Sequence, residues 1–132
     1  MYTDTISIFE DIDTDEGSKV IQYIISGVYF EASIGATLDK DGERKSYNAT
    51  VIIPERYKCS EGYMRPRAWE RLSFEEKLDN FTLHDGQVVA LIDHAIQCGS
   101  INDIINEYDD VYRVIGVEHY RGVLPHFEVL CK

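Results

Sequence analysis

The C-terminal segment VIGVEHYRGVLPHFEVLCK, residues 114–132, gathers side chains that could do chemistry: two histidines, an arginine and a cysteine. A cysteine nucleophile needs a neighbouring base that is itself oriented by a third group. Cys131 is the penultimate residue, where a strand is expected to fray, and no motif of a thiol enzyme surrounds it. The segment therefore argues against thiol catalysis, and the alternative is that it forms the last hairpin of a β-sheet.

A metal site is the second chemical hypothesis, because imidazole and carboxylate groups bind zinc and iron. His94, His119 and His126 could converge with Asp93 or Glu118, as a metal-dependent hydrolase would require. The sequence contains no H-x-H, H-E-x-x-H or C-x-x-C spacing, and distant single histidines are more often surface or core residues. We therefore expect no catalytic residue, no metal ion and no other cofactor, and we expect that the chain is not an enzyme.

The charge of the chain is strongly negative and unevenly distributed. Its 132 residues fit a single β-rich domain, residues 1–132, with a formal net charge of −11. Residues 1–39 carry eight acids and one lysine, a net charge of −7, whereas residues 44–71 carry seven bases and three acids, a net charge of +4. This polarity favours head-to-tail contacts between subunits, although such charges are often simply solvated. A surface this acidic argues against sequence-specific nucleic-acid binding and against membrane binding.

The cellular compartment is indicated by what the sequence lacks. The start, MYTDTISIF, has no basic region followed by a long apolar stretch, and no apolar run approaches the ~20 residues of a membrane span. The three cysteines cannot all pair with one another. We therefore expect a soluble protein of a reducing compartment with three free thiols.

Alternating and β-branched stretches predict antiparallel strands in the N-terminal half. TISIFE alternates between its two faces, and VIQYIISGVYFEASI predicts one bent strand or two, with a bulge at Gly27. Turns or loops are predicted for the polar stretch 11–19 and for Asp41-Gly42. YNATVIIP predicts a further strand that ends at its proline.

Two capping signals predict short helices. Ser73 is followed three residues later by Glu76, and Ser100 is followed by Asp103 at the same spacing. Three isoleucines should form the apolar face of the second helix. They are Ile101, Ile104 and Ile105.

The final strands are VYRVIGVEHY and LPHFEVLCK, with the turn expected over Glu118 to Gly122. The fold class is therefore mainly β (α+β). We expect an antiparallel β-barrel or sandwich with a long central excursion and one or two short helices.

The excursion, ERYKCSEGYMRPRAWERL, covers residues 55–72 and contains the side chains that bind partners most often. Tyrosine, arginine and tryptophan are enriched at binding hot spots, and long loops in small domains commonly carry function. We expect a partner-binding surface here. The alternative, compatible with the first, is that Tyr63 and Trp69 fold back over the barrel as core. The expected partner-binding residues are Tyr63, Arg65, Arg67 and Trp69.

Five features occur in a fixed order along the chain. They are ISIF at Ile6–Phe9, ATVIIP at Ala49–Pro54, the set Tyr63, Pro66 and Trp69, KLDNFTLHDGQ at Lys77–Gln87, and VEHYRGVLPHFEV at Val117–Val129. In this order they resemble small structural proteins of prophages and tailed phages of Gram-positive bacteria, known as minor capsid or head-tail connector proteins. The sequence departs from that pattern at Gln87, at His119-Tyr120 and at Phe127, where the pattern has an acid, Asp-Asn and Trp.

The resemblance implies a non-catalytic neck component, a stopper-like subunit that assembles into a homo-oligomeric ring. Its partners would be other neck, tail or portal-associated proteins, and it would reside in the virion after assembly in the bacterial host cytoplasm. An acidic surface suits a channel that must not trap passing DNA. Two alternatives remain, an acidic phage-encoded inhibitor or DNA-mimic regulatory protein, and the metal-dependent hydrolase considered above.

Overall fold

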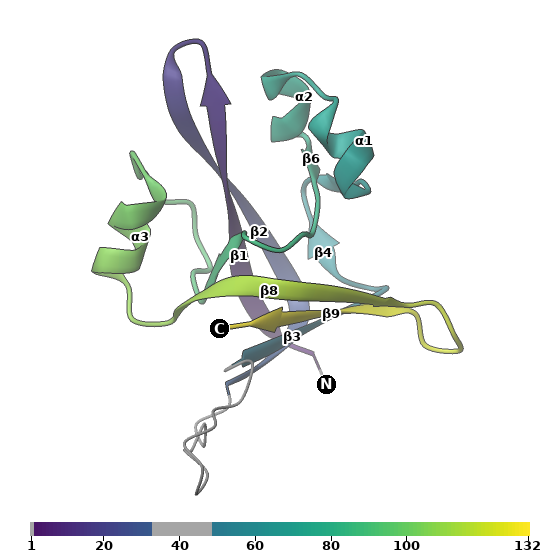
Figure 1. The fold of residues 1–132 in the computed structure, drawn as a ribbon. Coiled ribbons are helices and arrows are strands. Elements are labelled where there is room, and N and C mark those ends of the chain that lie inside the picture. Colours follow the sequence, from purple (N-terminus) through teal and green to yellow (C-terminus); the bar gives the residue numbers. More distant parts are fainter. Residues whose placement is uncertain (1, 33–48) are drawn as a thin grey trace, which may run out of the picture.

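The computed structural model describes residues 2–32 and 49–132 of the chain. Six antiparallel strands close into a barrel in the order β1-β7-β8-β9-β3-β2, and β2 pairs again with β1 (Figure 1). The prediction of a mainly β fold with an antiparallel barrel is confirmed. The described residues form three short helices, where one or two were expected. The barrel strands are β1 (Asp4–Thr14), β2 (Gly17–Ala32), β3 (Ala49–Pro54), β7 (Val88–Ala90), β8 (Val111–Tyr120) and β9 (His126–Cys131).

Strands β1 and β2 form a long hairpin that projects beyond the barrel (Figure 1). The polar stretch 11–19 was predicted as a turn or loop; the stretch does contain the turn, but the turn is much shorter than predicted. Only Asp15 and Glu16 form the turn, because the ladder continues to the pair Thr14 and Gly17. The Thr14 hydroxyl donates a 2.6 Å hydrogen bond to the carbonyl of Gly17 and helps to close this turn. The β1 residues of this stretch alternate between exposed and half-buried positions, but Ile12 is the one apolar side chain among residues 11–19, so the sequence resembles that of a loop.

Alternation along β1 separates two apolar cores. Ile6 and Ile8 are fully buried in the main core inside the barrel. Phe9 faces the other way, into a smaller core that also contains Ile92 and Ile104 and lies under α3 (Ile101–Glu107). The faces predicted from TISIFE are therefore confirmed. The two cores bury both faces of β1 over most of its barrel portion.

Gly27 bends β2, as predicted from its place in the apolar run. Asp4 pairs with Val28 and Thr5 pairs with Ser26, so the register skips Gly27. Its φ of +75° lies in the left-handed region, which glycine adopts without steric cost. Residues before the bend pair with β1 and with β4 (Lys58–Cys59), and residues after it pair with β3. The predicted turn at Asp41-Gly42, between β2 and β3, lies outside the described residues, as do Arg44 and Lys45.

The excursion and the segment after it cover one end of the barrel. They contain β5 (Gly62–Tyr63), α1 (Pro66–Glu70), α2 (Phe74–Leu78) and β6 (Asn80–Phe81), and β5 pairs with β6 in parallel. The capping box predicted at the start of α2 is confirmed, since the side chains of Ser73 and Glu76 bond each other's backbone amides.

The capping box of α3 is also confirmed, but its apolar face is narrower than predicted. Ile104 is buried and Ile101 packs against the smaller core, whereas Ile105 is 43% exposed. Adjacent helical residues are about 100° apart around the axis, so Ile104 and Ile105 cannot both face the barrel. No helix formed by the described residues is long and apolar enough to span a membrane.

The turn of the C-terminal hairpin lies later than predicted. Positions 118–120 were assigned to the turn but are paired strand, with Glu118 opposite Glu128 and Tyr120 opposite His126. The connection therefore spans residues 121–125. Aromatic and imidazole side chains stack across this part of the ladder. They stabilise strand pairing past the point where the alternation of apolar and polar residues ends.

The bulge in β2 yields a first prediction. Gly27→Ala places a Cβ 3.7 Å from the backbone of Arg56 and Tyr57, an ordinary contact distance. The cost should come from the positive φ, and the free energy of unfolding should fall by about 1–2 kcal/mol. Gly122→Ala is the matched control, because its φ is not positive and a Cβ there meets nothing within 4 Å. Urea unfolding of both variants measures this, and equal midpoints would contradict the assigned strain.

Candidate functional site

Trp69 lies in the core and not on the surface. It belongs to α1 and is only 5% exposed. Its indole Nε1 donates a 2.7 Å hydrogen bond to the carbonyl of Asn80, and the Lys77 ammonium lies 4.7 Å from the ring centroid. Of the two roles expected for Trp69, the structure supports the core role, because a side chain so enclosed offers little surface to a partner.

Tyr63 joins the excursion to the C-terminal hairpin. Its ring centroid lies 4.8 Å from that of Phe127 in β9, and Phe127 in turn stacks on His119 of β8 at 4.2 Å. The Arg121 Nε donates to the Nδ1 of His119 at 3.4 Å. The structure thus brings together Tyr63, a residue singled out in the excursion, and His119 and Arg121, singled out near the terminus.

Arg65 completes a patch that we call the hairpin cluster: Tyr63, Arg65, His119, Arg121 and Phe127. Partial desolvation lowers the pKa of His119, and the positive charges of Arg121 and Arg65 lower it further. The neutral form of the His119 imidazole is therefore favoured, because both guanidinium groups lie near it. Arg65 is exposed, so the cluster presents cationic and aromatic groups on an otherwise acidic molecule.

Arg67 also remains exposed, in the last turn of α1. Arg67 precedes the buried Trp69 by two positions, and residues two apart lie on different faces of a helix, so Arg67 lies on the outer face. Of the four residues expected to bind a partner, Tyr63 and Arg65 thus join the hairpin cluster, Arg67 lies apart on α1, and Trp69 is core. A partner-binding role for the two arginines stays a prediction.

The other face of the same hairpin carries His126 and the exposed tip. The His126 ring stacks on Tyr120 with 4.8 Å between centroids, and its Nε2 lies 3.0 Å from the carboxylate of Glu128. At the tip, Val123 is 98% exposed and Leu124 is 80% exposed. His119 and His126 therefore point to opposite faces, as strand alternation requires.

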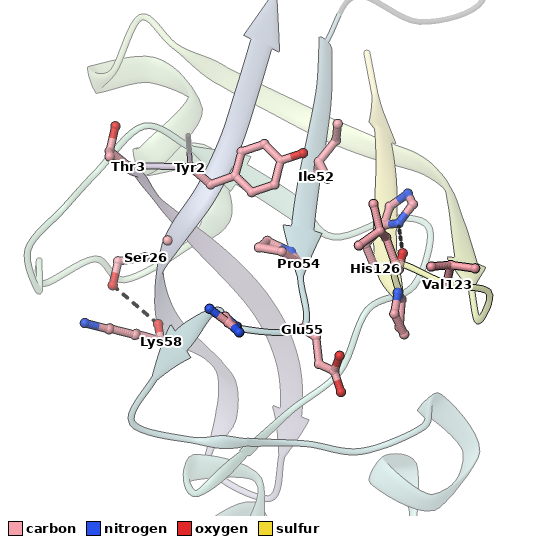
Figure 2. Close-up of a pocket in the computed structure, with 13 residues that line it drawn as sticks. Tyr2, Thr3, Ser26, Ile52, Pro54, Glu55, Lys58, Val123 and His126 are labelled. Atoms are coloured by element: carbon pink, nitrogen blue, oxygen red, sulfur yellow. Dashed lines mark hydrogen bonds between the residues drawn. The ribbon is translucent and has the colours of Figure 1, made fainter.

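A groove of about 800 Å³ lies between this tip, the end of β3 and the bulge in β2. Tyr2, Ile52 and Pro54 lie along its floor, with Lys58 at one margin and His126 at the other (Figure 2). The guanidinium of Arg56 adds a second positive charge to the lining, and Glu55 adds one negative charge. Val123 to His126 form the opposite wall. The groove is thus apolar within and mainly cationic at its margin.

A buried polar network ties β1 to the loop before β7. Glu10 is 5% exposed, and one of its oxygens accepts hydrogen bonds from His84 Nε2 and Gln87 Nε2, both at 2.7 Å. The His84 Nδ1 lies 2.6 Å from the carbonyl oxygen of Asp85. Both ring nitrogens thus face acceptors, which only the imidazolium can satisfy. The hydrogen bond to Glu10 accordingly raises the pKa of His84.

The histidines proposed as metal ligands are not brought together. His94 follows β7, where its carbonyl accepts a hydrogen bond from Gln22, while His119 and His126 lie at the far end of the β8–β9 hairpin. Within residues 2–32 and 49–132, no three His, Cys, Asp or Glu side chains are placed to share a metal ion. The three cysteines, all in the described part, are unpaired. Burial raises the pKa of both Cys59 and Cys131 to about 12, which keeps them protonated near neutral pH.

Sequence reasoning missed the buried network and the apolar tip, although signals for both were present. Glu10 shares the parity of Ile6 and Ile8 in TISIFE, so an inward carboxylate needing a partner was indicated. Val123 and Leu124 lie between Gly122 and Pro125, two residues typical of loops. An apolar pair inside such a loop has no strand face to bury it.

The fold and the site define a small, closed antiparallel β-barrel whose C-terminal hairpin carries exposed apolar, aromatic and cationic groups. The chain belongs to the family of unknown function DUF6751, whose model matches residues 1–132. No curated protein and no solved structure matches the chain.

Burial of the indole yields a second prediction. Trp69→Ala removes a large side chain from the core and should lower the free energy of unfolding by about 3–5 kcal/mol. Arg67→Ala, on the exposed side of the same helix, is the control and should change it by less than about 0.5 kcal/mol. Thermal and chemical unfolding compare the two. A Trp69→Ala protein as stable as wild type would contradict the core position and favour a role of Trp69 on the surface.

The buried network yields a third prediction, on pH. Because the folded-state pKa of His84 is raised above 6.5, the imidazolium stabilises the fold fully below that value. This stabilisation should be lost as the pH rises through the folded-state pKa. In the His84→Asn variant the free energy of unfolding should fall less steeply as the pH rises. The His94→Asn variant should show the same fall as wild type, because the His94 side chain is 69% exposed. Urea midpoints between pH 5 and pH 9 measure the slope, and identical slopes for wild type and His84→Asn would refute the pairing.

Proposed function

We propose that this protein is a non-catalytic structural subunit of a tailed-phage or prophage particle, acting at the neck between head and tail. The observation that carries the proposal is the apolar tip of the β8–β9 hairpin. Val123 and Leu124 are large apolar side chains that are 98% and 80% exposed on adjacent residues. When a partner covers two adjacent apolar side chains, their removal from water lowers the free energy of the complex.

The surroundings of the tip fit a protein partner. Next to it lies the hairpin cluster, in which two arginines border three rings. Arginine and tyrosine are enriched at binding hot spots, and an exposed apolar pair beside them supplies the contact that excludes water. The hairpin is also held by its own cross-strand stacking, so that little order has to be gained on binding.

A non-catalytic role is supported by the contacts of several ionisable groups, which already interact with neighbouring side chains or carbonyl groups. His84 and His126 have acceptors at both ring nitrogens. His119 stacks on Phe127 and accepts from Arg121. The raised pKa values of Cys59 and Cys131 oppose thiolate formation, which a thiol nucleophile needs.

The setting at the neck rests on the resemblance of five ordered stretches to phage connector proteins. In this proposal the subunit assembles in the host cytoplasm, enters the virion, and contacts portal-associated or tail proteins as well as copies of itself. The net charge of −11 suits that position, since an acidic channel repels DNA that must pass through it.

The fourth prediction tests the tip. Val123→Ser combined with Leu124→Ser should leave the fold intact, because both side chains are exposed. It should weaken binding to neighbouring particle proteins at least about tenfold, as expected for loss of a hot spot. Leu78→Ser, at an exposed leucine of α2, is the matched control and should bind normally. Co-purification with portal and tail proteins of the same particle measures binding, and unimpaired binding by the double variant would contradict the role of the tip.

The function itself is tested by deleting the gene from an inducible prophage. The proposal expects filled heads without tails, rescued by the wild-type gene and not by the double tip variant. Complete infectious particles from the deletion strain would overturn it. If the host response or the fate of host DNA changed instead, with particles intact, the inhibitor or DNA-mimic alternative would be favoured.

A further inference from the structure

We propose that one end of the barrel binds the opposite end of a second copy, with an acidic, apolar surface entering the cationic groove beside the hairpin tip. This inference rests on the proposed assembly function and names two of the surfaces that perform it. The receiving surface is the groove already described. The entering surface is the end formed by α3 and the segments on either side of it.

The entering surface, which we call the α3 end, combines negative charge with exposed apolar groups. Residues 91–110 contain five acids and neither lysine nor arginine. Ile105 is 43% exposed and Leu91 is 41% exposed, and the Leu91 amide donates to the carbonyl of Asp110 at 3.2 Å, which joins the two segments. The acids are exposed too. They are Asp93, Asp103, Glu107, Asp109 and Asp110.

The groove has the complementary composition. Tyr2, Ile52 and Pro54 give an apolar floor of the kind that an isoleucine or leucine side chain fills. Arg56 and Lys58 place two positive charges at the margin, opposed only by Glu55 among the acidic residues that line the groove. Figure 2 shows the Glu55 carboxylate directed away from Tyr2 and from the floor. An apolar side chain flanked by carboxylates therefore matches both the floor and the margin.

The two surfaces cannot meet within one molecule. The α3 end adjoins the start of β8, and the groove adjoins the hairpin tip after the end of β8 (Figure 1). Strand β8 has ten residues, and at about 3.3 Å per residue it separates the two surfaces by roughly 30 Å. Contact must therefore join different copies. A contact between two different surfaces is heterologous, and repeated contacts of that kind build rings or open filaments.

The other acidic projection of the molecule is a poorer fit to the groove. The tip of the β1–β2 hairpin carries Asp13, Asp15 and Glu16, but its nearest large apolar residue, Ile12, packs against the main core. Charge alone would attract this tip to the groove without filling the floor. Of these two acidic projections, the α3 end is the one that presents an exposed aliphatic side chain together with its carboxylates, so we assign the contact to it.

The fifth prediction is a charge exchange between the two surfaces. The pair Arg56→Glu and Lys58→Glu makes the groove acidic. The triple change Glu107→Lys, Asp109→Lys and Asp110→Lys makes the α3 end basic, because two of its five acids then face three lysines. Each variant alone should self-associate at least about tenfold more weakly than wild type, because both of its surfaces then carry the same sign. An equimolar mixture should associate again, since each groove then meets an end of opposite sign. Sedimentation velocity at low ionic strength, repeated at high salt, measures this.

A matched control is Asp13→Lys with Asp15→Lys and Glu16→Lys, which makes the same change in charge on the β1–β2 tip as the triple change makes on the α3 end, and which should associate like wild type or slightly better. Circular dichroism confirms that each variant is folded. The proposal is overturned if wild type stays monomeric at its highest soluble concentration, if either groove or end variant associates like wild type, or if the mixture does not recover. Failure of the assembly function appears separately, as intact particles from the gene deletion, whatever the charge exchange shows.

Discussion

The structure depends on the bend of β2 at Gly27, because that bend lets one strand take part in both halves of the barrel. Before it, β2 pairs with β1 along most of its length, and after it, β2 pairs with β3. A straight strand would carry β3 away from β1 and leave the sheet open. Closure then fixes the direction of β8 and β9, which connect β7 to β3 on the far side of the ring. The groove forms at the bend itself, with Gly27 and Ser26 in its lining.

The long strands make the molecule polar in shape as well as in charge. One end carries α3 and its acids, and the other carries the hairpin with its arginines, rings and apolar tip. Stacking of His119 on Phe127 and of Tyr120 on His126 extends the hairpin past the barrel wall. The tip therefore lies at the outer end of this ladder, where Val123 and Leu124 are exposed.

Local sequence rules predicted those parts of the fold that local forces decide. The alternation of TISIFE, the bulge at Gly27 and the capping boxes at Ser73 and Ser100 were all correct, since each depends on residues within a few positions. Turn positions in exposed hairpins were wrong, because cross-strand pairs extend those ladders without an apolar pattern. The contact of Glu10 with His84 joins residues 74 positions apart, and the buried indole of Trp69 donates to the carbonyl of Asn80 in β6. The first contact follows from the pairing of β1 with β7 in the closed barrel, and the second follows from the packing of α1 against β6. No local sequence pattern contains either of them.

The outer part of the β1–β2 hairpin, residues 11–20, forms its ladder only with itself among the described strands. Both of its edges therefore expose backbone donors and acceptors to which another chain could add a strand. Asp11, Asp13, Asp15 and Glu16 are exposed along this stretch, and a second copy approaching edge to edge would bring the same negative charges into contact. Such like-charge repulsion opposes uncontrolled sheet growth. The acidic hairpin thus opposes edge-to-edge aggregation of the protein by keeping its two unpaired strand edges apart from those of other copies.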